Sequence, residues 1–260
     1  MTILRQPSTI LEPRRSGRLV SLVAAALALS PLLVPNELAA AGGQRSVTTP
    51  FKEARMIIEY NETAEDIGVQ FFLDSEGWET VEIFAPDNEQ IYSATAEGRL
   101  LGQGGGTELF VESVEPSLDK LSIDEFFDRF PEGSYLFTGL SPEGDPLSAT
   151  DQFSHRIPRG PRIVLPGPGD ECAQGVAIPA VISWRGVVSA IDGAPVTIIG
   201  YQVIVERNGR HFDIQLPASA RKVTVPRQFL RPGSDYLFEV LAIESSGNQT
   251  ITEGCFRTAN

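Results

Sequence analysis

LRPGSDYLFEVLA, residues 230–242, is the stretch that decides the fold of the C-terminal part of this 260-residue chain. From Tyr236 onward apolar residues alternate, and a period of two predicts a β-strand. The other face is also largely apolar, which is typical of a central strand whose outer face is partly covered. Pro232 and Gly233 predict a turn before the strand, and the turn backbone can bond the hydroxyl of a buried Tyr236. Together these features predict a tyrosine corner in a Greek-key sandwich.

This stretch resembles the E–F turn and strand F of a fibronectin type III domain. The family run Leu-x-Pro-x-x-x-Tyr-x-x-x-Val-x-Ala maps onto Leu230, Pro232, Tyr236, Val240 and Ala242. The family also keeps a core Trp on strand B and a core Tyr on strand C, where this chain has Trp184 and Tyr201. The resemblance covers about residues 160–260 and implies a β-sandwich that usually serves as a non-enzymatic module. All matched positions are core positions, so no functional residue is carried over.

The remaining strands of this sandwich follow from alternating patterns and turn signals. We expect them at residues 162–165, 180–185, 198–207, 211–216, 223–225 and 249–257. Asn208 and Gly209 between two of these strands predict a tight hairpin, because both turn positions require a positive φ.

The N-terminal 41 residues are typical of a secretory signal peptide. They contain basic residues, an almost purely apolar run and a small-residue cleavage site, at Arg14, Arg15, Arg18, residues 19–29 and Ala39–Ala41. A membrane anchor is the alternative, but Pro31 and Pro35 leave the apolar run short for a span. We therefore expect an exported protein, periplasmic or extracellular, with no stable membrane span after cleavage.

Cys172 and Cys255 are the two cysteines of the chain. In an exported protein an even pair favours a disulfide, here closing a loop of about 80 residues and adding about 4 kcal/mol to stability. Two free thiols or a metal pair are the alternatives. His155 and His211 are the two histidines of the chain, which argues against zinc.

The charge is divided unequally between the two halves. Residues 51–158 hold 23 Asp and Glu against 6 Lys and Arg, a net charge of −17, whereas residues 159–260 have a net charge of +1. An acidic half argues against nucleic acid or anionic lipid as a partner. It favours a basic partner, divalent cations, or solubility alone.

Residues 51–157 predict a first, antiparallel sandwich. Strands are expected at residues 56–60, 67–73, 78–84, 90–94, 135–137 and 147–153, with turns at residues 74–77 and 86–88. Glycines at residues 102–106 predict a flexible loop, because they lack the ending of a nucleotide-binding loop. Trp78 is the aromatic residue to test on an exposed face, although core packing is its alternative role.

One short helix is predicted within residues 116–130. Ser122 can cap it and Glu125 stands at the capping-box position. Ile123, Phe126, Phe127 and Phe130 then share one face. We therefore expect the helix to close the sandwich. The alternative, a protruding partner-binding helix, would expose three Phe.

Few residues suggest chemistry. Asp74, Glu76 and Glu79 at one turn, and Asp124, Glu125 and Asp128 at another, are candidate calcium ligands, although no EF-hand pattern is present. Neither histidine has a nucleophile motif nearby, so we expect no catalytic site. No other cofactor is expected.

The sequence therefore predicts an all-β protein of two tandem antiparallel β-sandwich domains, the first with one short α-helix and the second fibronectin type III-like. The expected boundaries are residues 1–41 for the signal peptide, 42–50 for a flexible mature N-terminus, 51–157 and 162–260 for the domains, and 158–161 for the linker. The expected function is that of an exported non-catalytic module that contacts a protein or polysaccharide of the cell envelope or medium. The alternatives are a carbohydrate-active hydrolase with a carboxylate pair in the acidic domain, and an envelope structural or accessory subunit.

Overall fold

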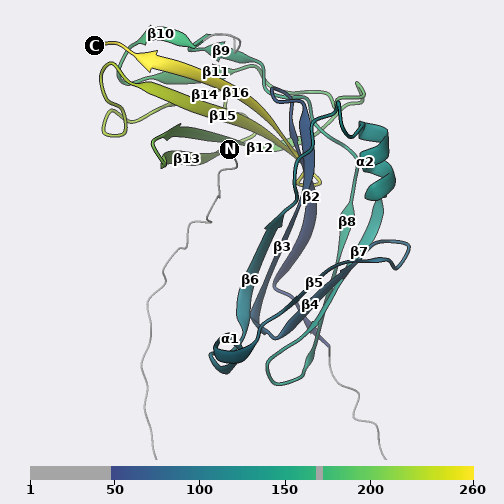
Figure 1. The fold of residues 1–260 in the computed structure, drawn as a ribbon. Helices are drawn as coiled ribbons and strands as arrows, with labels where there is room; N and C mark the ends of the chain where they lie inside the picture. The colour runs from purple at the N-terminus through teal and green to yellow at the C-terminus, as the bar shows by residue number, and fades with distance from the viewer. Residues whose placement is uncertain (1–47, 168–171) are drawn as a thin grey trace, which may run out of the picture. The chain divides into compact units, whose positions relative to one another are not determined.

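The computed structural model describes residues 48–167 and 172–260. Within these residues the fold is all-β, with two short helices (Figure 1). The proposed signal peptide lies outside the described residues, as does most of the expected mature N-terminus. No helix in the described part of the chain is long and apolar enough to span a membrane.

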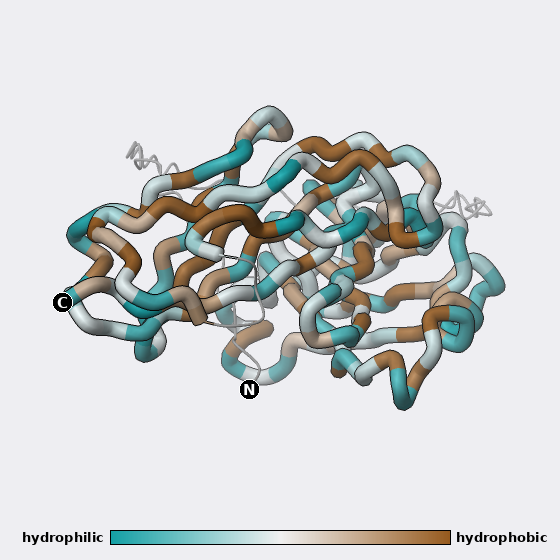
Figure 2. The backbone as a smooth tube through the Cα atoms, turned by 90° about the horizontal axis from the view of Figure 1, so that it is seen from above, coloured by the Kyte–Doolittle hydropathy of each residue, from teal (hydrophilic) through white to brown (hydrophobic). Residues whose placement is uncertain are grey.

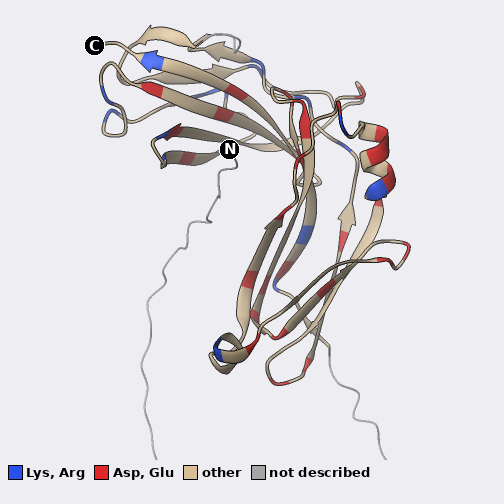
Figure 3. Cartoon of the chain, in the orientation of Figure 1, with Lys and Arg blue, Asp and Glu red and all other residues tan. Residues whose placement is uncertain are grey.

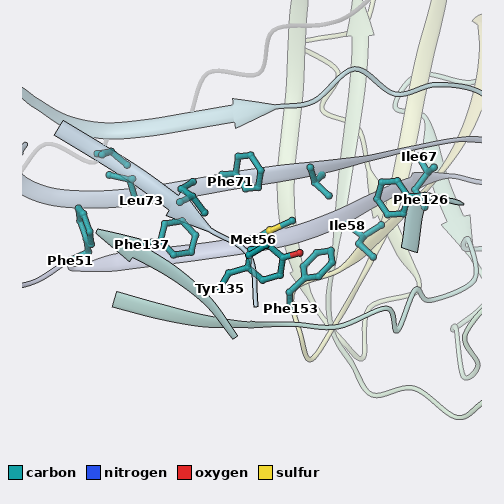
Figure 4. Close-up of a cluster of buried hydrophobic side chains, with 14 of the residues drawn as sticks. Phe51, Met56, Ile58, Ile67, Phe71, Leu73, Phe126, Tyr135, Phe137 and Phe153 are labelled. Atoms are coloured by element: carbon teal, nitrogen blue, oxygen red, sulfur yellow. The ribbon is translucent and has the colours of Figure 1, made fainter. Parts of the chain in front are cut away.

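The first half of the chain forms eight strands and both helices. They are β1 (Thr49–Pro50), β2 (Glu53–Asn61), β3 (Asp66–Trp78), β4 (Thr80–Phe84), β5 (Gln90–Thr95), α1 (Gly98–Gly102), β6 (Gly106–Glu112), α2 (Ile123–Arg129), β7 (Gly133–Leu140) and β8 (Pro146–Phe153). A five-stranded sheet has the order β1-β8-β7-β4-β5, and β2, β3 and β6 belong to a second sheet. Alternate residues of both sheets enter one core, where Figure 4 shows Met56, Phe71 and Phe137 among the side chains drawn.

Helix α2 closes this core. Ser122 and Glu125 form the expected capping box, in which Ser122 Oγ accepts from the Glu125 amide and the Glu125 carboxylate accepts from the Ser122 amide. Phe126 is buried and Phe127 packs against the same core, so the helix is not a protruding one. It begins at Ile123, later than the start of the predicted stretch, because Ser117 is bonded in a bridge to Asp66 of β3.

Three local predictions in this half are wrong. Helix α1 is a second helix, where the sequence analysis expected one. Residues 74–77 do not end the second strand, because β3 runs on to Trp78 through a register shift against β6. Trp78 thus belongs to β3 and is 6% exposed, which supports core packing over the exposed-face interpretation. The glycine-rich residues 102–106 are divided between the end of α1, a turn and the start of β6. A Cβ on Gly106 would clash with the Trp78 ring, so this glycine makes room for the indole.

The second half forms eight further strands. They are β9 (Ile163–Leu165), β10 (Ala173–Val176), β11 (Val181–Trp184), β12 (Ile198–Arg207), β13 (Arg210–Pro217), β14 (Lys222–Thr224), β15 (Asp235–Glu244) and β16 (Gln249–Thr258). Strands β14, β11 and β9 form a three-stranded sheet, and β13, β12, β15 and β16 are neighbours in the larger sheet. The expected strands are all present within one or two residues, and β10 is one that the sequence analysis did not anticipate.

The aromatic hub of this second core is as expected. Trp184, Tyr201, Leu230 and Tyr236 are all buried in it. The Tyr236 hydroxyl accepts from the Arg231 amide at 2.8 Å, which confirms the tyrosine corner. The Tyr201 hydroxyl accepts from the Val187 amide at 3.0 Å. Figure 2 shows hydrophobic and hydrophilic segments interspersed along the backbone of the molecule.

Cys172 and Cys255 form a disulfide with a Cα–Cα distance of 4.6 Å, as predicted. Cys255 lies on β16, and the residue after Cys172 begins β10, which pairs with β16 in parallel. The bridge therefore ties the segment between β9 and β11 to the last strand of the chain.

The two cores share one sheet, which the tandem arrangement did not anticipate. β16 pairs in parallel with β2, so one eight-stranded sheet has the order β13-β12-β15-β16-β2-β3-β6 and carries β10 on β16 (Figure 1). Asn248, which is buried, joins the halves with three hydrogen bonds: its Oδ1 accepts from the Ile58 amide, and its Nδ2 donates to the carbonyls of Ser154 and Arg156.

The segment expected to be a linker is bonded on both sides. The Pro158 carbonyl accepts from Thr250 Oγ1, the Arg159 amide donates to the Ser189 carbonyl, and the Gly160 amide donates to Glu62. These contacts fix the segment against elements of both halves. A domain boundary at residues 158–161 remains a proposal.

Candidate binding face

One face of the eight-stranded sheet is strongly acidic. Strand pairing puts Glu206 of β12 beside Leu237 of β15 and Leu237 beside Cys255 of β16. It likewise puts Gln249 of β16 beside Glu59 of β2. Because paired residues point to the same side of a sheet, a single face runs across the strands of both halves.

We call this surface the acidic face and define it by its carboxylates. They are Glu53, Glu59, Asp66, Asp74, Glu108, Glu112, Glu206, Asp213, Asp235, Glu239 and Glu253. The arginines at strand positions of the same face are Arg55 and Arg257. Figure 3 shows the acidic residues as red segments along strands of both halves, with few blue ones among them.

The pKa of one carboxyl of this face, that of Asp66, departs from its ordinary value. Burial, with a further contribution from the charge of Glu253, raises the pKa of the Asp66 carboxyl above its ordinary value. Burial and the neighbouring charges of Glu62 and Glu65 also raise the pKa of Tyr60, which lies beside this region on β2. Burial is the larger cause of both shifts, and acidic neighbours around the β2–β3 turn add to it.

The centre and the ends of the acidic face differ in exposure. Ile204, Leu241 and Ile251 form a small buried apolar cluster at its centre. Toward the ends, apolar side chains are exposed: Leu237 is 61% exposed and Phe110 is 41% exposed. The face thus combines negative charge with accessible apolar surface on either side of a buried strip.

A hollow of about 250 Å³ opens beside the disulfide at one end of this face. It is lined by Cys172, Glu206, Arg207, Asn208, Asp235, Tyr236, Leu237 and Cys255. The Oε2 atom of Glu206 is buried and has no hydrogen-bond partner among the described residues. We call this feature the disulfide hollow.

A second hollow, of about 470 Å³, lies where the β15–β16 turn meets β8. Its walls include Asp151, Glu244 and Ser246. Both carboxylate oxygens of the buried Glu244 accept hydrogen bonds, from the Ser246 amide and from Ser245 Oγ, and Asp151 accepts from the Met56 amide. These two acids of the second hollow are therefore engaged in hydrogen bonds within the protein.

Two residues of the first group of candidate calcium ligands form ion pairs with a lysine. Lys52 Nζ lies 2.9 Å from Glu76 and 3.8 Å from Asp74. The backbone of Glu79 extends the neighbouring sheet by donating to the Leu140 carbonyl. A calcium site at Asp74, Glu76 and Glu79 remains a proposal, and it would have to displace this ammonium group.

The second acidic group belongs to helix α2. Glu125 is committed to the capping box, and its hydrogen bonds from Ser122 lower the pKa of its carboxyl. Asp124 shares the first turn of the helix, where acidic side chains stabilise the positive end of the helix dipole. The helix thus accounts for two of the three carboxylates in this group, and Asp128 lies near its C-terminal end.

A third acidic group was missed by the sequence analysis. Glu59, Glu112 and Glu115 place carboxylate oxygens within 4.8 Å of one another. Glu59 is 3% exposed and accepts from Gln249 Nε2, and Glu112 accepts from Gln70 Nε2. These residues come together only through the pairing of β2, β3 and β6, which no sequence motif announces. Neither of the two hollows is lined by this group.

The histidines have structural surroundings. His155 stacks on Phe127 with ring centroids 3.8 Å apart, and its Nε2 lies 2.6 Å from the Phe130 carbonyl. It therefore holds the end of α2 against the end of β8. His211 pairs with Glu206 across β13 and β12.

Comparison with known proteins adds fold likeness only. No protein-family model and no curated protein sequence matches the chain. Among solved structures, the FN1–FN3 domains of chicken CNTN1 are 9% identical with a TM-score of 0.33; the match covers 82% of this chain and 65% of that one. A segment of two fibronectin type III domains from chicken tenascin is 11% identical with a TM-score of 0.29, covering 80% and 99%. The Clostridium perfringens spore cortex lytic enzyme SleM is 18% identical with a TM-score of 0.26, covering 39% and 28%.

Scores this low carry no argument about function. The fibronectin type III-like description of the second half rests on this chain's own strand order, its tyrosine corner and its buried Trp184 and Tyr201.

Proposed function

We propose that this chain is an exported, non-catalytic binding module that contacts a protein in the cell envelope or medium through the acidic face. The observation that carries the proposal is the predominance of carboxylates over basic residues on that face across strands of both halves, with exposed Phe110 and Leu237 among the carboxylates. Like charges gathered on one surface steer an oppositely charged partner and raise its rate of association.

The charge favours a protein partner with basic residues over a neutral polysaccharide. A sheet face that crosses both cores also has a fixed geometry, because the Asn248 hydrogen bonds and the β16–β2 pairing hold the strands in place. Binding to such a preformed surface has a lower cost in conformational entropy.

The test is a pull-down from envelope extract with the mature protein and two charge-neutralised variants. The first carries Glu53→Gln, Glu108→Gln and Asp213→Asn, which are exposed positions on the acidic face. The matched control carries Glu89→Gln, Glu97→Gln and Glu143→Gln, which are exposed and lie outside it.

We expect the native protein and the control to enrich the same partner, and the first variant to lose it. Binding should also weaken steeply with salt. Absence of any enriched protein, or equal capture by all three proteins, would contradict the proposal. A stable oligomer on size-exclusion chromatography with no captured partner would favour a structural subunit instead.

A further inference from the structure

The disulfide hollow combines an apolar wall with one acidic group. Leu237 is largely exposed there, and the Cys172–Cys255 bridge lies beside it. Pairing places Glu206, Leu237 and Cys255 in one row across three strands. The apolar surface and the carboxylate are therefore adjacent on a rigid part of the sheet.

The carboxylate of Glu206 has an oxygen that the protein itself leaves without a partner. Glu206 Oε2 is buried and accepts no hydrogen bond from any described residue. A buried acceptor in that condition costs free energy, about 1–3 kcal/mol, unless another group reaches it. Because Glu206 lines an open hollow, a donor that enters the hollow meets the carboxylate that carries this oxygen.

Two basic residues around the hollow are engaged elsewhere. Arg257 Nη1 lies 2.7 Å from Asp235 Oδ2 in an ion pair at the rim. The guanidinium carbon of Arg207 lies over the Tyr236 ring, 5.8 Å from its centroid. Around the hollow the further carboxylates Glu239 and Glu253 of the next row add negative charge.

We propose that the disulfide hollow receives one lysine or arginine side chain of the protein partner. Long basic side chains lay an apolar stem along apolar surface and carry the charge at the tip. Here the stem packs on Leu237 and the disulfide, and the tip donates to Glu206. At about 250 Å³ the hollow is smaller than the sites that hold whole drug-sized ligands, which suits a single side chain. The inference rests on the proposed function, because it assigns one anchor point within the acidic face.

The experiment titrates the ¹⁵N-labelled mature protein with three blocked pentapeptides, Gly-Gly-X-Gly-Gly, in which X is Lys, Arg or norleucine. The norleucine peptide keeps the apolar stem and removes the charge. We expect the Lys or Arg peptide to shift the amide signals of residues 206, 237 and 255, and the norleucine peptide to leave them unchanged. Equal shifts with norleucine would overturn the proposal.

Two variants localise the effect. Glu206→Gln keeps the shape and should weaken binding about tenfold, the factor that 1.4 kcal/mol gives. Leu237→Arg places a long basic side chain next to the hollow and should abolish peptide binding. Glu82→Gln, on the separate sheet that holds β4, is the control and should bind as the native protein does. Unchanged melting temperatures establish that all variants are folded.

Failure here is distinguishable from failure of the proposed function. If no peptide binds, or if Glu206→Gln binds as well as the native protein, the hollow is not an anchor. The pull-down result with Glu53, Glu108 and Asp213 neutralised stays valid in either case, because none of those residues lines the hollow.

Discussion

Both halves of the molecule hold a buried tyrosine near the start of a central strand, four residues after a proline. Tyr236 follows Pro232 and bonds the turn before β15, and Tyr135 follows Pro131 and donates from its hydroxyl to the Pro131 carbonyl at 3.1 Å. Each tyrosine is followed by Leu and Phe, and the Phe is buried in both cases. Burial, with the charge of Asp87, raises the pKa of Tyr135 to about 12.

The flanking residues separate the two sites. Around Tyr236 the family pattern continues with Leu230 and Val240, whereas the positions equivalent to these around Tyr135 are Arg129 and Gly139. The first core is completed instead by helix α2, which ends just before Pro131. A corner of the same kind can thus be built with much less sequence signal when a helix supplies the missing apolar surface. The predictions below are ways to test how far the two halves are alike.

The largest expected effect on stability is that of the disulfide, which only the second half has among the described residues. Replacing Cys172 and Cys255 with Ser opens a loop of 83 residues, and the free energy of unfolding should fall by about 4–5 kcal/mol. Denaturant unfolding followed by fluorescence measures it, since each core contains one tryptophan, Trp78 or Trp184. Reduction of the native protein should reproduce the loss. An unchanged midpoint would mean that the bridge constrains nothing in the unfolded chain.

Asn248→Ala should weaken the connection between the halves. Three hydrogen bonds of a buried side chain are lost, so we expect a decrease of about 3 kcal/mol. The native protein should unfold in one transition, and the variant should show separate transitions for Trp78 and Trp184. Gln202→Ala, on an exposed hydrogen bond to Asp213, is the control and should stay within about 0.5 kcal/mol. Coincident transitions in the variant would show that the shared sheet alone couples the cores.

The two tyrosines should differ when each loses its hydroxyl. Tyr236→Phe leaves the Arg231 amide without its acceptor and should cost about 2 kcal/mol. Tyr135→Phe leaves a carbonyl, which tolerates the loss better, and should cost about 1 kcal/mol. Thermal unfolding of both variants compares them directly. A larger loss at Tyr135 would reverse the ranking and make the first corner the stronger one.

The smallest effect concerns charge. The folded-state pKa of Asp66 is raised, so its ionised form opposes folding at neutral pH. As the pH falls through that pKa, the folded state takes up a proton before the unfolded state does, and the penalty disappears. Asp66→Asn should therefore raise the melting temperature by about 1–2 °C at pH 7, with no gain at acidic pH. A gain that persists after protonation would point to packing and not to charge.

Local patterns in the sequence predicted much of the second half. The strands there alternate cleanly and Asn208 with Gly209 marks the hairpin, so the structure confirms them nearly residue by residue. In the first half the Ser122–Glu125 capping box was also predicted correctly from the sequence. Strand β6 and the continuation of β3 to Trp78 were missed, because a bulge and a glycine-rich start conceal the period of two.

The sequence by itself determined the all-β fold, the disulfide, the aromatic hub of the second core and the acidic character of the first half, since each of these depends on neighbours along the chain or on composition. Tertiary structure alone decided that β16 pairs with β2, that the two cores share a sheet, and that Glu206 lies beside Leu237 and Cys255. Register between distant strands is set by how whole faces bury their apolar side chains. A surface assembled from seven strands is therefore visible only after those strands have been paired.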